Sequence, residues 1–414
     1  MLPLDLKALE LDIERIEDKA SELGLDFFDM KFVLCTPEEM SFIGAYGMTG
    51  RFSHWIFGRD FYKLYLRHRL GLVKVHELVV NSDPCIAFLL KGNTILENKM
   101  AVAHAFAHSD FFKNNIHYSH DPKTVLRFFA ENHRLLLEYE ECYGKQRVEK
   151  FLEAVLALRS LYFSQGLRGD DKGFQRTGEE DIYLYLCRKS EVLESWQREI
   201  IHRLRGELEY FRSLARTRII NEGWAAFWHT RILRELDLPA EEAVEFAVKN
   251  AETLSHEMGE INLYLFGKEI FTALEKELGI KEIFRIRRRE NDLGFIEKYL
   301  SLDLIKKLGL FFYRKGKSGV REIVSDPAII KKLLLRGIYG CWHPLIVIAE
   351  GEEDNNELCL RHQYDGRQRN SYYAKKTLEL IHLLWGETVS LETFWEGRPV
   401  VFIYSGKEHI LRNK

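Results

Sequence analysis

Apolar residues recur at intervals of three or four positions along most of residues 1–304, the spacing that predicts amphipathic helices packed on a core. Two of these helical stretches differ from the others. Residues 97–115 and 217–234 surround a few polar side chains with small or aromatic apolar residues, which favours a position inside the core. We therefore expect these two helices to be central to the fold.

A short β element interrupts the helical pattern. Residues 73–80 and 85–90 are β-branched runs on either side of a turn sequence, which predicts strand, turn and strand. From residue 308 the period changes to two, which predicts an antiparallel sheet with helices on one face. We expect a mainly α protein, with a large helical domain over residues 1–304 and a small α+β domain over residues 305–414.

Composition and charge narrow the class of protein. The 414 residues are many for one core, and 46% hydrophobic against 30% charged residues is the balance of a folded globular protein. The formal net charge of -3 gives no field that would attract nucleic acid or an anionic membrane. Six cysteines without a CxxC pair favour a reducing compartment. We find no secretion signal or membrane-spanning run, so we expect a cytoplasmic protein.

The first candidate chemistry is a histidine pair in residues 97–115. His104 and His108 are four residues apart, so their imidazoles lie one above the other on one helix face. Helical zinc sites present their first two ligands with this spacing. The usual zinc-protease helix has a general-base Glu directly after the first His, and this chain has Ala105 there.

The second half of the candidate site is the helix over residues 217–234. Gly223 inside it costs about 1 kcal/mol relative to alanine, which predicts a close approach of another backbone or of the metal-bearing helix. Glu222 and His229 are seven residues apart and share a face. Such groups are costly to bury unless they bind each other, a metal or a polar network.

Several longer motifs carry a resemblance to a known family. They are HAFAHSDFFKNN, NEGWAAFWHTRIL, YGMTGRFSHWIFG and HELVVNSDPCIAFLL, with the later stretches Trp342–Asp365 and Leu384-Trp385-Gly386. From residue 46 to the end, the chain resembles the stage V sporulation protein R (SpoVR-like) family. The resemblance implies a cytoplasmic protein needed by spore-forming bacteria to assemble the peptidoglycan of the spore cortex.

A second resemblance concerns the site. The Glu-Gly-Trp-Ala sequence at residues 222–225 looks like the helix that supplies the third ligand in gluzincin-type zinc peptidases. It implies a zincin-like fold and a zinc site, for which the ligands are His104, His108 and Glu222. Asn221 and His229 would contact these ligands without binding the metal themselves.

The catalytic carboxylate has to come from elsewhere than position 105. Two candidates are Glu77, on the strand before the histidine helix, and Asp110, two residues past His108 and on a different helix face.

These observations leave two functional interpretations. One is a zinc-dependent amide hydrolase with a peptide-like substrate. The other is a non-catalytic regulator or scaffold that binds a protein partner on a degenerate metallopeptidase-like fold, which Ala105 favours. A site without metal is also open, in which Glu222 accepts hydrogen bonds from the histidines.

Overall fold

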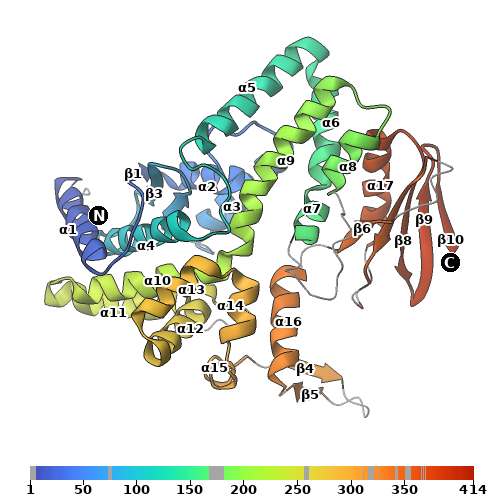
Figure 1. Ribbon diagram of the computed structural model, residues 1–414. Coiled ribbons are helices and arrows are strands. Elements are labelled where there is room, and N and C mark those ends of the chain that lie inside the picture. The colour runs from blue at the N-terminus through green and yellow to red at the C-terminus, as the bar shows by residue number, and fades with distance from the viewer. Residues whose placement is uncertain are drawn as a thin grey trace. The chain divides into compact units, whose positions relative to one another are not determined.

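The computed structural model describes residues 6–72, 77–166, 181–255, 261–310, 312–315, 321–324, 326–340, 344–349, 356–364, 366, 368 and 370–414. The protein is mainly helical with small sheets, as the sequence predicted (Figure 1). None of the helices in the described part of the chain combines the length and the hydropathy that crossing a bilayer requires.

Contacts between Cα atoms divide the chain into two compact units, each made of two segments. The first unit comprises residues 1–133 and 213–331, and the second comprises residues 134–212 and 332–414. This grouping differs from the division predicted at residues 304 and 305. That division stays a prediction, and proteolysis can test it.

The first unit holds the candidate site. Its elements are α1 (Leu6–Glu22), β1 (Met30–Cys35), α2 (Pro37–Tyr46), α3 (Trp55–Arg69), β2 (Glu77–Val80), β3 (Cys85–Leu90), α4 (Ile95–Asn114), α10 (Arg218–Glu235), α11 (Ala240–Thr253), α12 (Leu263–Leu278), α13 (Ile280–Arg289), α14 (Asp292–Tyr299), α15 (Leu302–Lys307), β4 (Phe312–Lys315) and β5 (Arg321–Val324). Three further helices, in which the chain passes between the units, are α5 (Val125–Tyr143), α9 (Ser195–Arg216) and α16 (Pro327–Gly340).

A three-stranded sheet lies against α4. Its order is β1-β3-β2, with β1 parallel and β2 antiparallel to β3, and Glu77 pairs with Leu89. The predicted strand, turn and strand are therefore present from Glu77 onward, while residues 73–76 lie outside the described residues. Both β2 and β3 contact α4, so the sheet places Glu77 beside the histidine helix.

Helices α4 and α10 form the centre of this unit, as their patterns predicted. In α4, 16 of 20 residues are buried, and in α10, 13 of 18 are buried. A capping box fixes the start of α4, because Thr94 accepts from the Glu97 backbone N–H while the Glu97 carboxylate accepts from that of Thr94. Since both helices are buried on nearly all sides, their polar side chains must find partners inside the protein.

The glycine in α10 has a clear steric reason. A Cβ placed on Gly223 would lie 2.4 Å from the Cα of Gly267 in α12, and one on Gly267 would lie 2.5 Å from the Cα of Gly223. The close backbone predicted for Gly223 is therefore that of α12. The histidine helix α4 packs on α10 as well, but it is not what requires the glycine.

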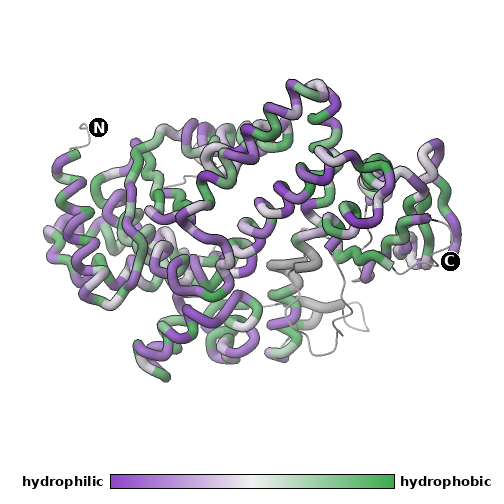
Figure 2. The backbone as a smooth tube through the Cα atoms, turned by 45° about the horizontal axis from the view of Figure 1, so that its top comes forward, coloured by the Kyte–Doolittle hydropathy of each residue, from purple (hydrophilic) through white to green (hydrophobic). Residues whose placement is uncertain are grey.

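The second unit combines helices with a five-stranded sheet. Besides parts of α5, α9 and α16, it contains α6 (Lys145–Ala157), α7 (Arg159–Gly166), α8 (Ile182–Lys189), β6 (Ile346–Ile348), β7 (Leu358–His362), α17 (Ser371–Trp385), β8 (Val389–Trp395), β9 (Arg398–Tyr404) and β10 (His409–Asn413). Figure 2 shows hydrophilic and hydrophobic residues alternating along its helices, the pattern of helices that pack one face on a core.

The sheet of the second unit corrects one expectation. Its strand order is β10-β9-β8-β7-β6, and β7 and β8 are parallel, so the sheet is mixed and not purely antiparallel. The reason is α17, which connects β7 to β8 as a crossover helix and lets the two strands run in the same direction. Helix α17 also packs on α6, which belongs to the earlier segment of this unit.

Candidate metal centre

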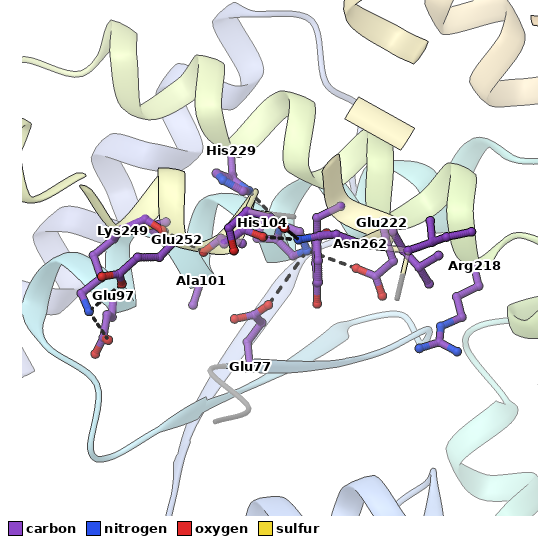
Figure 3. Close-up of a pocket in the computed structure, with 16 residues that line it drawn as sticks. Glu77, Glu97, Ala101, His104, Arg218, Glu222, His229, Lys249, Glu252 and Asn262 are labelled. Atoms are coloured by element: carbon purple, nitrogen blue, oxygen red, sulfur yellow. Dashed lines mark hydrogen bonds and ion pairs between the residues drawn. The ribbon is translucent and has the colours of Figure 1, made fainter. Parts of the chain in front are cut away.

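Two histidines of α4 and one glutamate of α10 converge in the first unit. The Nε2 atom of His104 lies 3.5 Å from Glu222 Oε2, and the Nε2 atom of His108 lies 3.7 Å from the same oxygen. One ligand atom from each of the three residues lies within 4.8 Å of the other two. The structure thus brings together the three residues that the sequence proposed as ligands, and Figure 3 shows His104 and Glu222 close to each other.

A chain of hydrogen bonds from His104 through His229 to Asn250 determines which nitrogen of His104 carries the proton. The side-chain oxygen of Asn250 lies 3.1 Å from His229 Nε2, so that nitrogen is the donor. Burial, followed by the charge of His104, lowers the pKa of His229 to about 3, so His229 is neutral and its Nδ1 is an acceptor. His229 Nδ1 lies 2.9 Å from His104 Nδ1, which must therefore donate. The Nε2 atom of a neutral His104 is left with a free lone pair.

The same argument holds for His108. Its Nδ1 donates to the side-chain oxygen of Asn221 at 2.9 Å. Burial, and then the charge of His104, lowers the pKa of His108 to about 4. His108 is therefore neutral, with the lone pair of Nε2 directed at Glu222. Asn221 and His229 hold the ligand histidines in the tautomer that binds a metal.

This arrangement fits a metal better than a closed polar network. The Nε2 atom of His104 is buried and has no hydrogen-bond partner, and the distances of 3.5 and 3.7 Å to Glu222 exceed ordinary hydrogen-bond lengths. In tetrahedral zinc sites with bonds of about 2.0–2.1 Å, neighbouring ligand atoms are roughly 3.3–3.5 Å apart. The two distances are close to that spacing.

The electrostatics also favour a cation between these groups. Burial alone would lower the pKa of His104, but the nearby carboxylates of Glu222 and Glu77 more than offset this effect and raise it. Burial acts to raise the pKa of Glu222, and its contacts with His104 and His108 more than offset that effect and lower it. The carboxylates therefore create a negative potential at His104 Nε2, which a proton or a metal ion can satisfy.

Glu77 joins the site from the sheet. Its Oε1 atom lies 3.9 Å from His104 Nε2, and 17% of its side chain is exposed. Burial and the charge of Glu222 raise its pKa, while the charge of His104 opposes them. Figure 3 shows Glu77 pointing toward His104 from below, on the side opposite His229.

Asp110, the other candidate for the catalytic carboxylate, has different partners. Its Oδ1 accepts from the backbone N–H of Asp26 at 2.8 Å, and its Oδ2 accepts from Trp224 Nε1 at 2.8 Å. Arg287 lies 3.4 Å from Oδ2. The side chain is fully buried, and burial raises its pKa to about 6. These contacts tie α4 to α10 and α13, and Asp110 is not among the residues that line the pocket at the site.

A pocket of about 670 Å³ opens onto His104 and Glu222. It is lined by Glu77, His104, Glu222 and His229 together with residues of α11 and α12. One of these is Tyr264, whose ring centroid lies 5.7 Å from that of His104. Sequence reasoning gave Tyr264 no role, because a single tyrosine within a long helical stretch has no distinguishing pattern.

Tyr264 places a phenol among the residues that line the pocket. The negative charge of Glu222, together with burial, raises the pKa of Tyr264 well above its ordinary value. The phenol therefore keeps its proton at neutral pH and can donate a hydrogen bond into the pocket.

Comparison with known proteins agrees with the motifs. A family model described as SpoVR like protein matches residues 4–170 and 161–331. The "Uncharacterized protein YcgB" of Escherichia coli (strain K12) is 29% identical over 277 residues, covering 55% of this chain and 54% of that protein. The chain thus spans about half the length of this curated relative. No solved structure matches, so the likeness to zincin folds stays a prediction. Because the family model covers most of the chain, this protein belongs to the SpoVR-like family.

Proposed function

We propose that this protein is a zinc-dependent amide hydrolase that acts on a peptide-like substrate in spore cortex formation. Membership of the SpoVR-like family suggests a sporulation-related protein. The single observation that carries the enzymatic part is the meeting of two imidazole nitrogens and a carboxylate at one site, with a second carboxylate next to His104 and a pocket beside it.

In this proposal His104, His108 and Glu222 hold the metal. When bound, zinc would supply a water with a pKa lowered to about 7 and a Lewis acid for the carbonyl group of the amide. Glu77 accepts one proton from the attacking water, whose oxygen bonds to the carbonyl carbon. Glu77 then passes this proton to the amide nitrogen as the C–N bond breaks, giving a carboxylic acid and an amine. Tyr264 donates a hydrogen bond to the carbonyl oxygen as negative charge develops there.

The second candidate function is a non-catalytic regulator or scaffold. Ala105 favours it, because the residue that acts as base on the usual zinc-protease helix is missing. The location of Glu77 favours the enzyme, because a carboxylate on β2 reaches the same histidine from the sheet. The two functions differ in what they require of Glu77, since only an enzyme needs its proton transfer.

Two measurements test the proposal. Elemental analysis of untagged protein should find about one zinc per chain, and His104→Ala and Glu222→Ala proteins that remain folded should lose it. Glu77→Gln should keep zinc and stability while lowering amide hydrolysis by about 10²–10⁴-fold. In a sporulating host it should give the same cortex defect as the ligand variants. Glu277→Gln, an exposed change on α12, is the matched control and should leave activity unchanged.

The proposal has two points of failure. Zinc at background level, or zinc content that does not depend on His104 and Glu222, would refute the metal site. Zinc bound as expected, with normal spores from Glu77→Gln, would refute the role of Glu77 and favour the scaffold.

A further inference from the structure

A single arginine lies at one end of the pocket. Arg218 is the first residue of α10 and precedes Glu222 by four positions, so both side chains lie on the same helix face. Arg218 lines the pocket, is exposed, and forms no ion pair with any residue that the structure describes. A guanidinium group therefore faces the pocket one helical turn from a metal ligand.

The other cation of the pocket is already neutralised. Lys249 Nζ lies 3.2 Å from Glu252 Oε2 and 4.0 Å from Glu97 Oε1, so two carboxylates surround one ammonium group. Figure 3 shows these three residues on one side of Glu77 and His104, with Arg218 on the other side beyond Glu222. Among the described residues, the pocket thus has a guanidinium group without an ion pair at one end and an excess of negative charge at the other.

We infer that Arg218 binds a carboxylate of the substrate, so that the site takes a short peptide with a free carboxylate near the amide bond that is cleaved. The inference rests on the proposed function. A guanidinium group offers paired N–H donors that match both oxygens of a carboxylate. A pocket of about 670 Å³ accommodates a few residues of a peptide. The acidic end suits an amino group at the opposite end of the same substrate.

Small dicarboxylates are the probes that test this inference. We would titrate the zinc-loaded full chain with succinate, glutarate and adipate and with the corresponding monoamides, using calorimetry. One carboxylate can reach the zinc and the second can reach Arg218, and the three chain lengths sample the distance between them. At least one dicarboxylate should bind about tenfold tighter than its monoamide or better.

Three variants locate the source of this preference. Arg218→Gln should abolish the difference between acid and amide. Arg218→Lys should keep only part of it, because lysine retains the charge but not the paired donors. Arg234→Gln removes an exposed arginine from the last turn of the same helix and should leave the preference unchanged.

Binding to the zinc ion itself is measured separately with acetohydroxamate, which binds zinc without needing a second carboxylate. If acetohydroxamate binds to the zinc-loaded protein but the dicarboxylates show no advantage, or if Arg218→Gln keeps that advantage, the inference is overturned and the proposed function stands. If acetohydroxamate binding is absent, or is not lost in His104→Ala, the proposed function fails and the inference fails with it.

Discussion

The crossing of α10 and α12 makes a strong prediction about Gly223. A Cβ at this position would lie 2.4 Å from the Cα and 2.5 Å from the carbonyl carbon of Gly267, whereas ordinary contacts are 3.4–4 Å. Both atoms belong to the backbone and cannot move aside as a flexible side chain would. An alanine at 223 therefore requires the two helices to separate by about 1 Å or more.

The net cost follows from two opposing contributions. Alanine is favoured over glycine inside a helix by about 1 kcal/mol, while overpacking a core costs about 1–3 kcal/mol and sometimes more. Because the clash is between backbones, we take the upper value and expect Gly223→Ala to lower the free energy of unfolding by about 2 kcal/mol. The helices carry Glu222 and Tyr264, so zinc affinity should fall as well.

Urea denaturation followed by tryptophan fluorescence measures this effect. The matched control is Gly58→Ala in α3, where an added Cβ has no atom within 4 Å. That variant should gain about 0.5–1 kcal/mol, because only the backbone preference remains. If Gly223→Ala matched or exceeded the wild-type protein in stability, the helices could not be in backbone contact at this glycine, and the reasoning would be refuted.

Three further predictions address the surroundings of the site. Asp110→Asn should destabilise the protein by about 3–5 kcal/mol in urea denaturation, because it leaves the charge of Arg287 buried and unpaired; a loss of activity without a loss of stability would contradict this structural role. His229→Phe should weaken zinc affinity about 10–100-fold in a chelator competition, since it removes the acceptor for His104 Nδ1; unchanged affinity would refute the tautomer argument. Because α17 packs on α6, proteolytic fragments from residues 305–414 should stay bound to the rest of the chain on gel filtration; separate elution would support the predicted two-domain division.

Helical spacing predicted the central helices and the faces on which their polar residues lie. It placed His104 and His108 on one face, because this property depends only on residues within one helix. The cost of a glycine inside a helix identified Gly223 as a point of close approach. It could not show that the approaching backbone belongs to Gly267, since the pairing of α10 with α12 is a tertiary contact between distant parts of the chain.

The directions of side chains between helices were also beyond sequence reasoning. The sequence offered Glu77 and Asp110 as candidates and favoured Glu77 only because its strand immediately precedes the histidine helix. The packing of α4 against α10 and the sheet is what shows that Asp110 binds Trp224 inside the core, while Glu77 lies beside His104. Tyr264 had no distinguishing pattern at all. The two-segment composition of each compact unit could not be inferred for the same reason, because a change of period marks where strands begin and not which helices they pack on.

Zinc-dependent stability separates the roles of the two carboxylates in the site. A ligand that binds only the folded state at 100 times its dissociation constant stabilises a protein by about 2.7 kcal/mol. Wild-type protein should gain this amount when zinc is added in thermal or urea denaturation. Glu77→Gln should gain it too, because Glu77 lies beside the ligands without being one, whereas Glu222→Gln should gain much less. A protein whose histidines and glutamate form only a polar network would respond to zinc in none of the three cases. If Glu77→Gln lost the zinc response along with Glu222→Gln, Glu77 would be a fourth ligand, and the proton transfer would need another residue.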